Sequence, residues 1–191
     1  MFKRINNNID LASQEQSISD YWDKIGAFDN SMQNRKKEKT FRFYDGPPFP
    51  TGSPHYGNLL AGVIKDIVPR YWTMRGYYVE RRFGWDVHGL PIEMEVQKQL
   101  GLEDHQQIKE FGIGKFNEAC RSQVQTNTEN WERVTRKIGR WVDFENDYKT
   151  MDIDFMESVW WVFKNLWEND LIYKDYKVLP YSWSAATPLS N

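Results

Sequence analysis

Cysteine is almost absent from this 191-residue chain, because Cys120 is its single thiol. One thiol can form neither an internal disulfide nor a cysteine pair for a metal, which fits a reducing compartment. Long apolar runs are missing too, so no segment reaches the length of a membrane span. The polar residues 1–16 lack the apolar region of a secretory signal. We therefore expect a cytoplasmic protein without membrane contact.

An excess of positive charge is also lacking, since the formal net charge is −2. Any contact with a nucleic acid would have to come from local basic patches. What the sequence has in abundance is aromatic residues, at 16%, including nine Trp, beside 40% hydrophobic and 27% charged residues. Such rings bury a large apolar area per residue, so we expect a globular protein with a sizeable core.

The first forty residues predict a helical arm followed by a linker. Residues 1–16 are polar and are expected to be loosely ordered. Ser17, with Asp20 three residues on, predicts a helix start. The following apolar residues recur at helical spacing. Residues 34–39 (NRKKEK) predict a solvated connector.

Residues 41–84 predict a strand, a loop, a helix and a second strand. FRFYD (41–45) is typical of a buried strand, and the loop GPPFPTGSP is too rich in proline and glycine for a helix or a central strand. The helix is expected to begin at His55 or Tyr56, to kink at Pro69 and to end before Gly76. With a second strand over 77–84, this makes a right-handed parallel βαβ unit.

The remainder is predicted to be mostly helical. Pro91 is expected in the first turn of a helix that runs to about Leu100. Apolar residues at helical spacing predict a long helix over 116–141 and another over 154–169. In the latter, Trp160 and Trp161 are expected to pack in the core. Residues 171–183 predict short strands.

The loop and the helix start carry the candidate chemistry. Free N–H groups and the helix dipole favour an anion where a helix begins. His55 at that position and Asn58 one turn on can both donate hydrogen bonds. Gly57 lacks the Cβ that would keep a phosphate or a planar ring at a distance. The arrangement suits a site that stabilises charge on transferring phosphate oxygens without a protein nucleophile. A simple turn-and-cap role is the alternative.

In this context PHYGN resembles the HIGH signature of the class I aminoacyl-tRNA synthetases. The resemblance runs from about Tyr44 to the end of the chain, and YDGPPFPTGSPHYGN with GWDVHGLPIE is similar to the isoleucine branch. It implies that His55, Gly57 and Asn58 contact ATP, which arrives with Mg²⁺. It further implies that Gly46 and Pro47 line the isoleucine pocket, and that Asp86 receives the substrate ammonium group.

Several residues keep alternative interpretations. Asp86 could cap the helix near Pro91, and Asp45 could either hold the loop or face the ligand. His88 is expected to be structural, and His105 to lie on the surface. Asn58 replaces the second histidine of the signature, so its contact with ATP should survive with an altered pH dependence.

The metal expectation also departs from part of the family. Many bacterial isoleucine enzymes of the family that this sequence resembles carry a Cys-x-x-Cys pair just before TPLS. Ser182 and Ala185 stand at those positions here, and neither is a zinc ligand. We therefore expect no metal site and no zinc in this chain.

The resemblance implies an α/β fold, the N-terminal half of a Rossmann-type catalytic domain with a parallel sheet and long helices. The expected boundaries are 1–40 for the arm and linker, 41–175 for the half-domain, and 176–191 for the start of an editing insertion. The implied activity is isoleucine–tRNA ligation with ATP, isoleucine and tRNA(Ile) as partners, by a monomer. A chain of this length alone is expected to form no isoleucyl-adenylate, because no KMSKS-like loop is present.

Rival interpretations remain. The first two are a leucyl- or valyl-tRNA synthetase and a small adenylyltransferase, which would lack GWDVHGLPIE. The third is a noncatalytic nucleic-acid-binding module that uses a basic helix face. That face would consist of Arg133, Arg136, Lys137 and Arg140.

Overall fold

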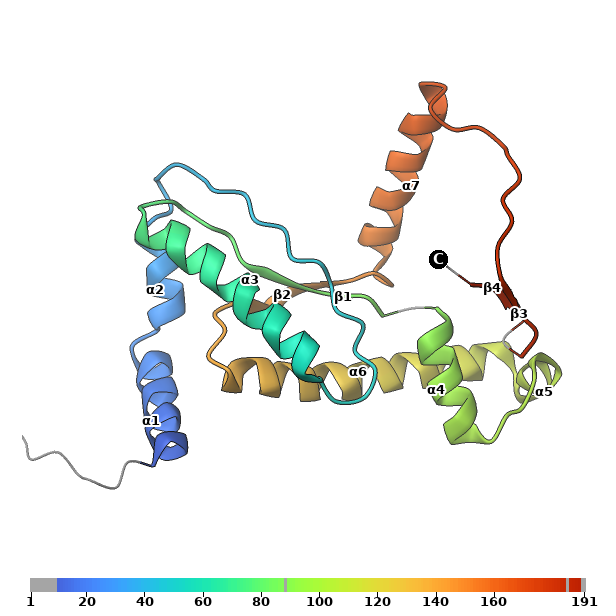
Figure 1. Ribbon diagram of the computed structural model, residues 1–191, viewed down its shortest axis with the longest axis horizontal. Helices are drawn as coiled ribbons and strands as arrows, with labels where there is room; N and C mark the ends of the chain where they lie inside the picture. Colours follow the sequence, from blue (N-terminus) through green and yellow to red (C-terminus); the bar gives the residue numbers. More distant parts are fainter. Residues whose placement is uncertain (1–9, 88, 185, 190–191) are drawn as a thin grey trace, which may run out of the picture. The chain divides into compact units, whose positions relative to one another are not determined.

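The computed structural model describes residues 10–87, 89–184 and 186–189. Its elements (Figure 1) are α1 (Leu11–Lys24), α2 (Ala27–Gln33), α3 (Tyr56–Met74), β1 (Arg82–Trp85), α4 (Leu90–Leu100), α5 (His105–Phe111), α6 (Ile113–Lys137), β2 (Asp143–Lys149), α7 (Ile153–Glu168), β3 (Tyr181–Ser182) and β4 (Thr187–Pro188). The chain divides into two compact units, Met1–Asp152 and Ile153–Asn191. All predicted site residues lie in the first unit.

Helix α1 begins earlier than predicted. Asp10 caps it and accepts from the backbone N–H of Ser13 at 3.4 Å. The predicted cap, Ser17, donates its hydroxyl to the Ser13 carbonyl inside the helix, so the predicted start is wrong. A carboxylate accepts from the first N–H groups more strongly than a hydroxyl does, which explains the earlier start. Residues 11–16 are therefore helical rather than loosely ordered; residues 1–9 lie outside the described part.

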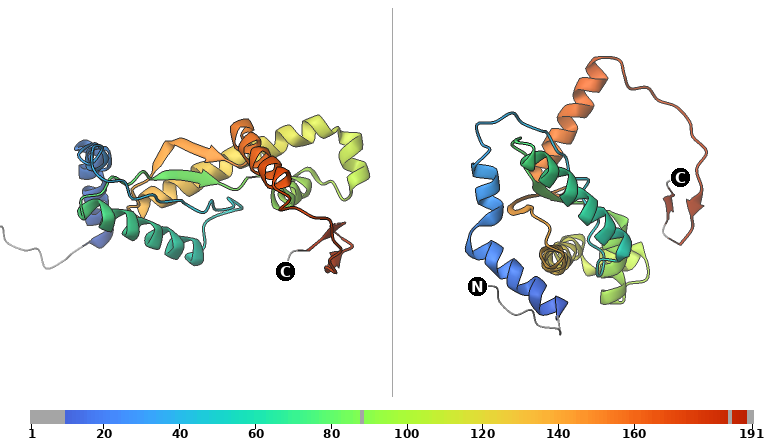
Figure 2. Two further views of the ribbon diagram at one scale, coloured as in Figure 1. Left: turned by 90° about the horizontal axis from the view of Figure 1, so that it is seen from above. Right: turned by 60° about the vertical axis from the view of Figure 1, so that its left-hand side comes forward.

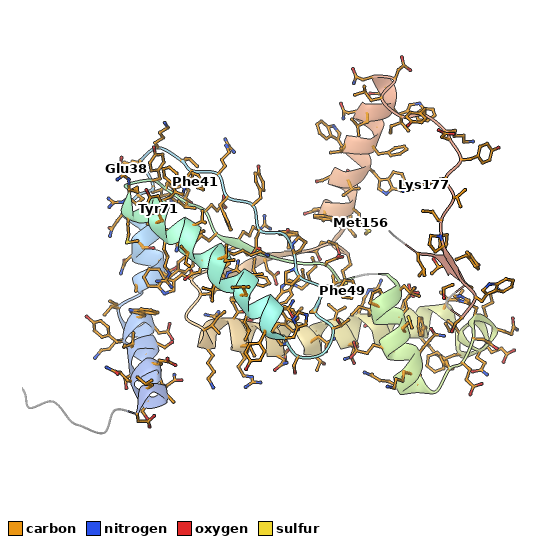
Figure 3. All side chains as sticks on the ribbon, in the orientation of Figure 1. Glu38, Phe41, Phe49, Tyr71, Met156 and Lys177 are labelled. Carbon is orange, nitrogen blue, oxygen red and sulfur yellow. The ribbon has the colours of Figure 1, made fainter. Side chains whose placement is uncertain are left out.

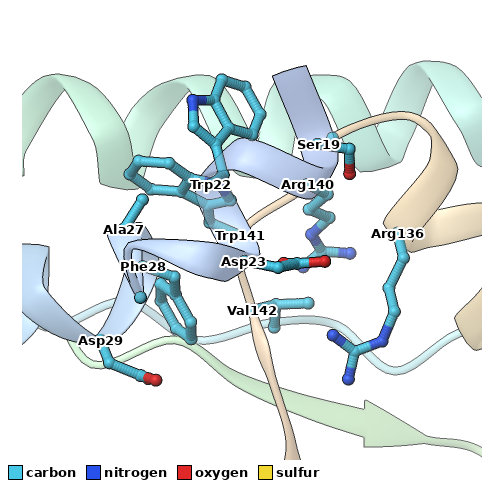
Figure 4. A pocket seen from close by; sticks show the side chains of 12 residues that line it. Ser19, Trp22, Asp23, Ala27, Phe28, Asp29, Arg136, Arg140, Trp141 and Val142 are labelled. Atoms are coloured by element: carbon cyan, nitrogen blue, oxygen red, sulfur yellow. The ribbon is translucent and has the colours of Figure 1, made fainter. Parts of the chain in front are cut away.

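The two N-terminal helices pack on the segment that follows α6. Trp22 on α1 contacts Trp141 edge-to-face, with ring centroids 5.3 Å apart, and Phe28 on α2 lies 6.4 Å from the same ring. The guanidinium of Arg70 lies over the Trp141 ring at 3.9 Å. Figure 4 shows these rings on the wall of a cavity of about 210 Å³ together with Arg136 and Arg140. Aromatic packing thus joins the predicted arm to the sheet unit.

A parallel sheet crosses the first unit. β1 pairs with β2 in parallel through Arg82 with Asp143, Gly84 with Tyr148 and Trp85 with Lys149, with a register shift after the first pair. The predicted parallel pairing across α3 is confirmed at one bridge, Thr40 with Tyr78. Strand β2 was not predicted, because DFENDYK is highly charged and lacks β-branched residues.

The predicted strand over 41–45 is wrong as an assigned strand. Its backbone pairs with the neighbouring segment at Phe41, whose N–H donates to the Tyr78 carbonyl at 2.9 Å. At the other end, the Asp45 carbonyl accepts the Tyr148 hydroxyl instead of a strand N–H. Phe41 also stacks on Trp72 of α3 with centroids 4.7 Å apart. Figure 3 shows Phe41 beside the end of α3 that carries Tyr71. Side-chain contacts therefore replace the ladder along this segment.

Helix α3 agrees with the prediction at both ends. His55 is its N-cap, and Gly76 follows its C-cap with a φ of 94°. The Tyr77 N–H donates to the Trp72 carbonyl and the Gly76 N–H to the Thr73 carbonyl, at 3.0 and 3.1 Å. This is the Schellman arrangement, which glycine favours. The helix continues through Pro69, and the predicted kink stays a prediction.

Helices α4, α5 and α6 complete the first unit, with α4 and α5 lying against α6 (Figures 1 and 2). Pro91 lies in the first turn of α4, as predicted. The long helix ends at Lys137, earlier than predicted, because Gly139 takes a φ of 74°. The short α5 was not predicted. The buried core consists of Phe83, Trp85, Val87, Ile92, Val96, Phe116, Val124, Trp131, Val142 and Phe144.

The second unit contains α7 and a small antiparallel hairpin of β3 and β4. Helix α7 confirms the predicted helix. Within this unit Trp160 and Trp161 are 69% and 65% exposed and no residue of α7 is buried among the described residues, so their predicted core packing is not found there. Residues 171–180 are not strand, while Tyr181–Ser182 is. None of the described helices has the length and hydropathy of a membrane span.

Candidate active site

The loop over residues 46–54 leads into the N-terminus of α3, and His55 forms the junction. The side chain of His55 is exposed, and its Nδ1 accepts a hydrogen bond from the Gly57 N–H at 3.1 Å. A ring nitrogen that accepts carries no proton, so the proton of a neutral His55 ring resides on Nε2. The cap therefore leaves Nε2 as a hydrogen-bond donor at the start of the helix.

Gly57 makes room for this ring. A Cβ at Gly57 would lie 3.0 Å from Cε1 and 3.1 Å from Nδ1 of His55, closer than ordinary van der Waals contact. Glycine therefore lets the imidazole lie over the first helical turn. The prediction assigned this glycine to ligand access, and the structure gives it a further role in seating His55.

Asn58 completes the helix start. Its side-chain Oδ1 accepts from the His55 backbone N–H at 3.0 Å, and its backbone N–H donates to the His55 carbonyl at 2.9 Å. With Oδ1 engaged, the side-chain NH₂ group is the part of Asn58 that remains to donate. His55 and Asn58 thus present donors beside the positive end of the helix dipole, as an anion requires.

Asp86 lies where β1 ends, between the loop and the segment after β2. Its N–H donates to the Pro48 carbonyl at 2.9 Å, and its Oδ1 lies 3.5 Å from the Thr150 hydroxyl. The N-cap of α4 is Gly89 without a side-chain cap, so the alternative role of Asp86 as a helix cap is not found. The carboxyl ends of parallel strands are where ligands bind in such sheets. Asp86 therefore lies at the edge of the sheet where a ligand-binding carboxylate is expected.

A cavity of about 240 Å³ lies beneath the loop, between α3 and α6. Among the predicted residues Gly46, Pro47 and Asn58 line it, whereas His55, Gly57 and Asp86 do not. The structure therefore gathers one part of the predicted site around the cavity. It places the other part at the helix start and at the strand end.

Asp45 holds the loop, which decides between its two predicted roles. Its side chain is fully buried and forms ion pairs with Arg140 and, at 2.7 Å, with Lys65 Nζ. The Tyr148 hydroxyl donates to the Asp45 carbonyl at 3.1 Å. Burial, and then the nearby Asp45 charge, raises the pKa of the Tyr148 phenol. Asp45 therefore faces protein partners rather than a ligand.

Three residues around the loop were missed from the sequence. Lys65 lies two helical turns after Asn58, a spacing that could have indicated it. Trp131 donates its indole N–H to the Gly52 carbonyl at 2.9 Å, and Arg140 reaches Asp45 from beyond the end of α6. No local pattern predicts these two contacts, because each joins segments far apart in the chain.

The other histidines and the predicted absence of zinc concern residues outside the loop. His105 is exposed, as expected, and begins α5. His88 and Ala185 lie outside the described residues. Within residues 10–87, 89–184 and 186–189, no group of three or more potential metal ligands is found. The expectation of no zinc stays a prediction.

Comparison with known proteins gives consistent relatives. Isoleucine–tRNA ligase of Bdellovibrio bacteriovorus is 52% identical over 190 residues, covering 100% of this chain and 18% of the relative. The enzyme of Mycobacterium tuberculosis is 55% identical over 182 residues, covering 95% of the chain and 18% of the relative. A cytoplasmic isoleucine–tRNA ligase of Arabidopsis thaliana is 53% identical over 178 residues, covering 93% and 15%. The chain thus spans less than a fifth of the length of these relatives.

Solved structures support the predicted fold. A crystal structure of a ternary complex of Agrobacterium radiobacter LeuRS with tRNA and LeuAMS gives a TM-score of 0.58 at 22% identity, covering 88% of this chain and 19% of that one. This likeness, with the parallel sheet and its helices, confirms the predicted α/β class and the N-terminal Rossmann-type half. The family model described as tRNA synthetases class I (I, L, M and V) matches residues 17–191. The chain therefore belongs to the class I tRNA synthetases, as its HIGH-like signature predicted.

Proposed function

We propose that this chain supplies part of the active site of an isoleucine–tRNA ligase. In the first reaction, a carboxylate oxygen of isoleucine attacks the α-phosphorus of ATP, the bond from that phosphorus to the bridging oxygen breaks, and pyrophosphate leaves. In the second, a hydroxyl oxygen of tRNA(Ile) attacks the carbonyl carbon of the isoleucyl-adenylate, the bond from that carbon to the phosphate oxygen breaks, and AMP leaves. The observation that carries the proposal is the pair of hydrogen bonds accepted by His55 Nδ1 and Asn58 Oδ1 at the start of α3, which leave His55 Nε2 and the Asn58 NH₂ group as donors.

The helix start acts on ATP. ATP would enter as its Mg²⁺ complex, in which the cation would reduce the repulsion between its phosphate charges. His55 and Asn58 donate to phosphate oxygens, whose negative charge grows as the α-phosphorus is attacked. Because the side-chain and backbone hydrogen bonds at the cap already fix both residues, little reorganisation is needed during the reaction.

The loop and Asp86 act on isoleucine. The carboxylate of Asp86 is the natural partner for an ammonium group. Gly46 and Pro47 form a small apolar wall of the cavity. A wall of this kind separates isoleucine from valine by one methylene, worth ~1–3 kcal/mol. This modest discrimination fits the predicted start of an editing insertion at residue 176.

The test uses an enzyme of the relatives' full length that carries this sequence, assayed by isoleucine-dependent ATP–pyrophosphate exchange. Asn58→Ala should lower kcat/KM about a hundredfold, as the loss of one donor to developing charge does. Asn58→His should retain activity with an altered pH dependence. His55→Ala is compared with His105→Ala, a control that removes an exposed histidine outside the proposed site. Full activity in Asn58→Ala would contradict the proposed role.

Competing functions are separated by the same assay. Exchange that depends on leucine or valine instead of isoleucine would assign the chain to another branch. The basic helix face is less available than a nucleic-acid-binding module requires, because Arg140 is buried against Asp45 and Arg136 pairs with Glu132. If that face nevertheless bound tRNA, removal of its charges would change the salt dependence of binding.

Compartment and partners follow from the same proposal. One relative is named a cytoplasmic form, and we infer that compartment here. Recognition of tRNA(Ile) and action as a monomer stay predictions, as do the domain boundaries after residues 40 and 175. The first two can be tested by sedimentation with and without tRNA.

A further inference from the structure

Lys65 makes a contact that links α3 to the loop. Its ammonium group donates to the Gly46 carbonyl at 2.6 Å and lies 2.7 Å from Asp45 Oδ1. The side chain is 28% exposed, and it lines the cavity together with Gly46, Pro47 and Asn58. One cation therefore holds two consecutive residues of the segment that enters the loop.

Neutralising Asp45 does not by itself require Lys65. Arg140, 6% exposed, already pairs with the fully buried carboxylate. A buried carboxylate with one well-placed cation is compensated, and a second cation adds less. What Lys65 provides in addition is the hydrogen bond to Gly46, for which no other donor is recorded within the described residues.

The loop is held through its carbonyl groups. Lys65 on α3 binds the carbonyl of Gly46, the Asp86 N–H binds that of Pro48, and the Trp131 indole on α6 binds that of Gly52. Proline has no N–H, so a proline-rich loop offers few donors for ladder pairing. Each of the three attachments therefore fixes a separate point, and the three donors lie on α3, directly after β1 and on α6.

We infer that Lys65 is a positioning residue for the amino-acid pocket. It fixes the Gly46–Pro47 wall relative to α3, which carries Asn58, and through the loop it fixes the Pro48 carbonyl against the N–H of Asp86. This inference rests on the proposed function. Lys65 touches no reacting atom, so its loss should weaken isoleucine binding more than turnover.

Two substitutions separate position from charge. Lys65→Met keeps the length and the apolar stem but removes the donor. Lys65→Arg keeps the charge, but its side chain is longer and its N–H groups lie in one plane, so they meet the two acceptors in a different geometry from the ammonium group. Lys149→Met is the matched control, because Lys149 is 27% exposed and also forms a 2.7 Å ion pair, with Asp147. That control pair contacts neither Gly46 nor the loop within the described contacts.

The kinetic experiment uses an enzyme of the relatives' full length that carries this sequence. Lys65→Met should raise the KM for isoleucine about tenfold in pyrophosphate exchange, with kcat and the KM for ATP within about threefold, since ground-state binding is what is lost. Lys65→Arg should raise the KM for isoleucine less than Lys65→Met does. The inference is overturned if Lys65→Met leaves that KM unchanged, or if Lys149→Met raises it equally.

A second measurement does not depend on activity. In the same protein without ligands, hydrogen exchange at the Asp86 amide should be about tenfold faster in Lys65→Met than in the unsubstituted protein, because the Pro48 carbonyl is then less firmly placed. Unchanged exchange would overturn the inference. If the unsubstituted enzyme showed no isoleucine-dependent exchange of pyrophosphate, the proposed function would fail, and hydrogen exchange alone would decide on Lys65.

Discussion

Gly84 offers the sharpest test of the sheet. It lies on β1 opposite Tyr148 of β2, whose ring covers it. A Cβ at Gly84 would lie 2.2 Å from Cζ and 2.4 Å from both Cε1 and Oη of that ring. Ordinary van der Waals contact begins near 3.4 Å, so in Gly84→Ala the ring must retreat by about 1.2 Å.

The expected cost has two parts. Overpacking of this kind destabilises a protein by about 1–3 kcal/mol. Moving the ring also breaks the hydrogen bond from Tyr148 to the Asp45 carbonyl, worth about 0.5–1.5 kcal/mol. We therefore expect Gly84→Ala to lower the free energy of unfolding by ~1.5–4.5 kcal/mol, the sum of the two parts, measured by urea unfolding followed through tryptophan fluorescence.

The control is Gly114→Ala. Gly114 lies in the first turn of α6, and a Cβ there meets nothing within 4 Å. Alanine is the better helix former, so this variant should be neutral or more stable by up to about 1 kcal/mol. In a Tyr148→Ala background, Gly84→Ala should cost little. Equal effects of Gly84→Ala in both backgrounds would refute the argument.

The remaining predictions concern separate groups. Arg140→Met should destabilise the fold by up to ~3 kcal/mol, because the buried Asp45 then keeps the partly exposed Lys65 as its cation. Arg136→Met, in a more exposed pair, should cost below ~1 kcal/mol; similar losses in urea unfolding would contradict this. Burial, with the nearby charge of Glu93, raises the pKa of Cys120, so its alkylation by iodoacetamide should rise at higher pH in the folded than in the urea-unfolded chain. The same shift makes stability fall as pH rises past the ordinary thiol range, and coincident alkylation profiles would exclude it. Asp86→Asn should increase the KM for isoleucine by a much larger factor than the KM for ATP. Equal increases in the two KM values would argue against an ammonium site.

Local sequence predicted the helix boundaries that depend on local chemistry. His55 at the start of α3, Pro91 in the first turn of α4 and Gly76 after α3 each act within a few residues, so their effects can be read from the chain alone. Asp10 shows the limit of this approach. A better cap lay upstream of Ser17, in a stretch whose polarity suggested disorder.

The contacts that organise the site could not be predicted in the same way. Asp45 pairs with Arg140, which lies 95 residues further along the chain. Strand β2 forms because its few apolar residues, such as Phe144, are buried beside Phe83 and Trp85. Neither depends on propensity or spacing. The residue types of the site were predictable, whereas the supports that hold them were not, because they come from tertiary packing.

The carbonyl attachments of the loop have a consequence for selectivity. The carbonyls of Gly46 and Pro48 are already occupied by Lys65 and by the Asp86 N–H, and Pro47 and Pro48 have no N–H. This stretch of backbone therefore offers a bound side chain no N–H at Pro47 or Pro48, and two of its carbonyls already accept a hydrogen bond. A polar side chain of isoleucine's size, pressed against it, would lose its water without a replacement, at a cost of ~1–3 kcal/mol. The same attachments that keep the wall in place would make it a dry surface, on which a hydrocarbon is accepted and a hydroxyl is penalised.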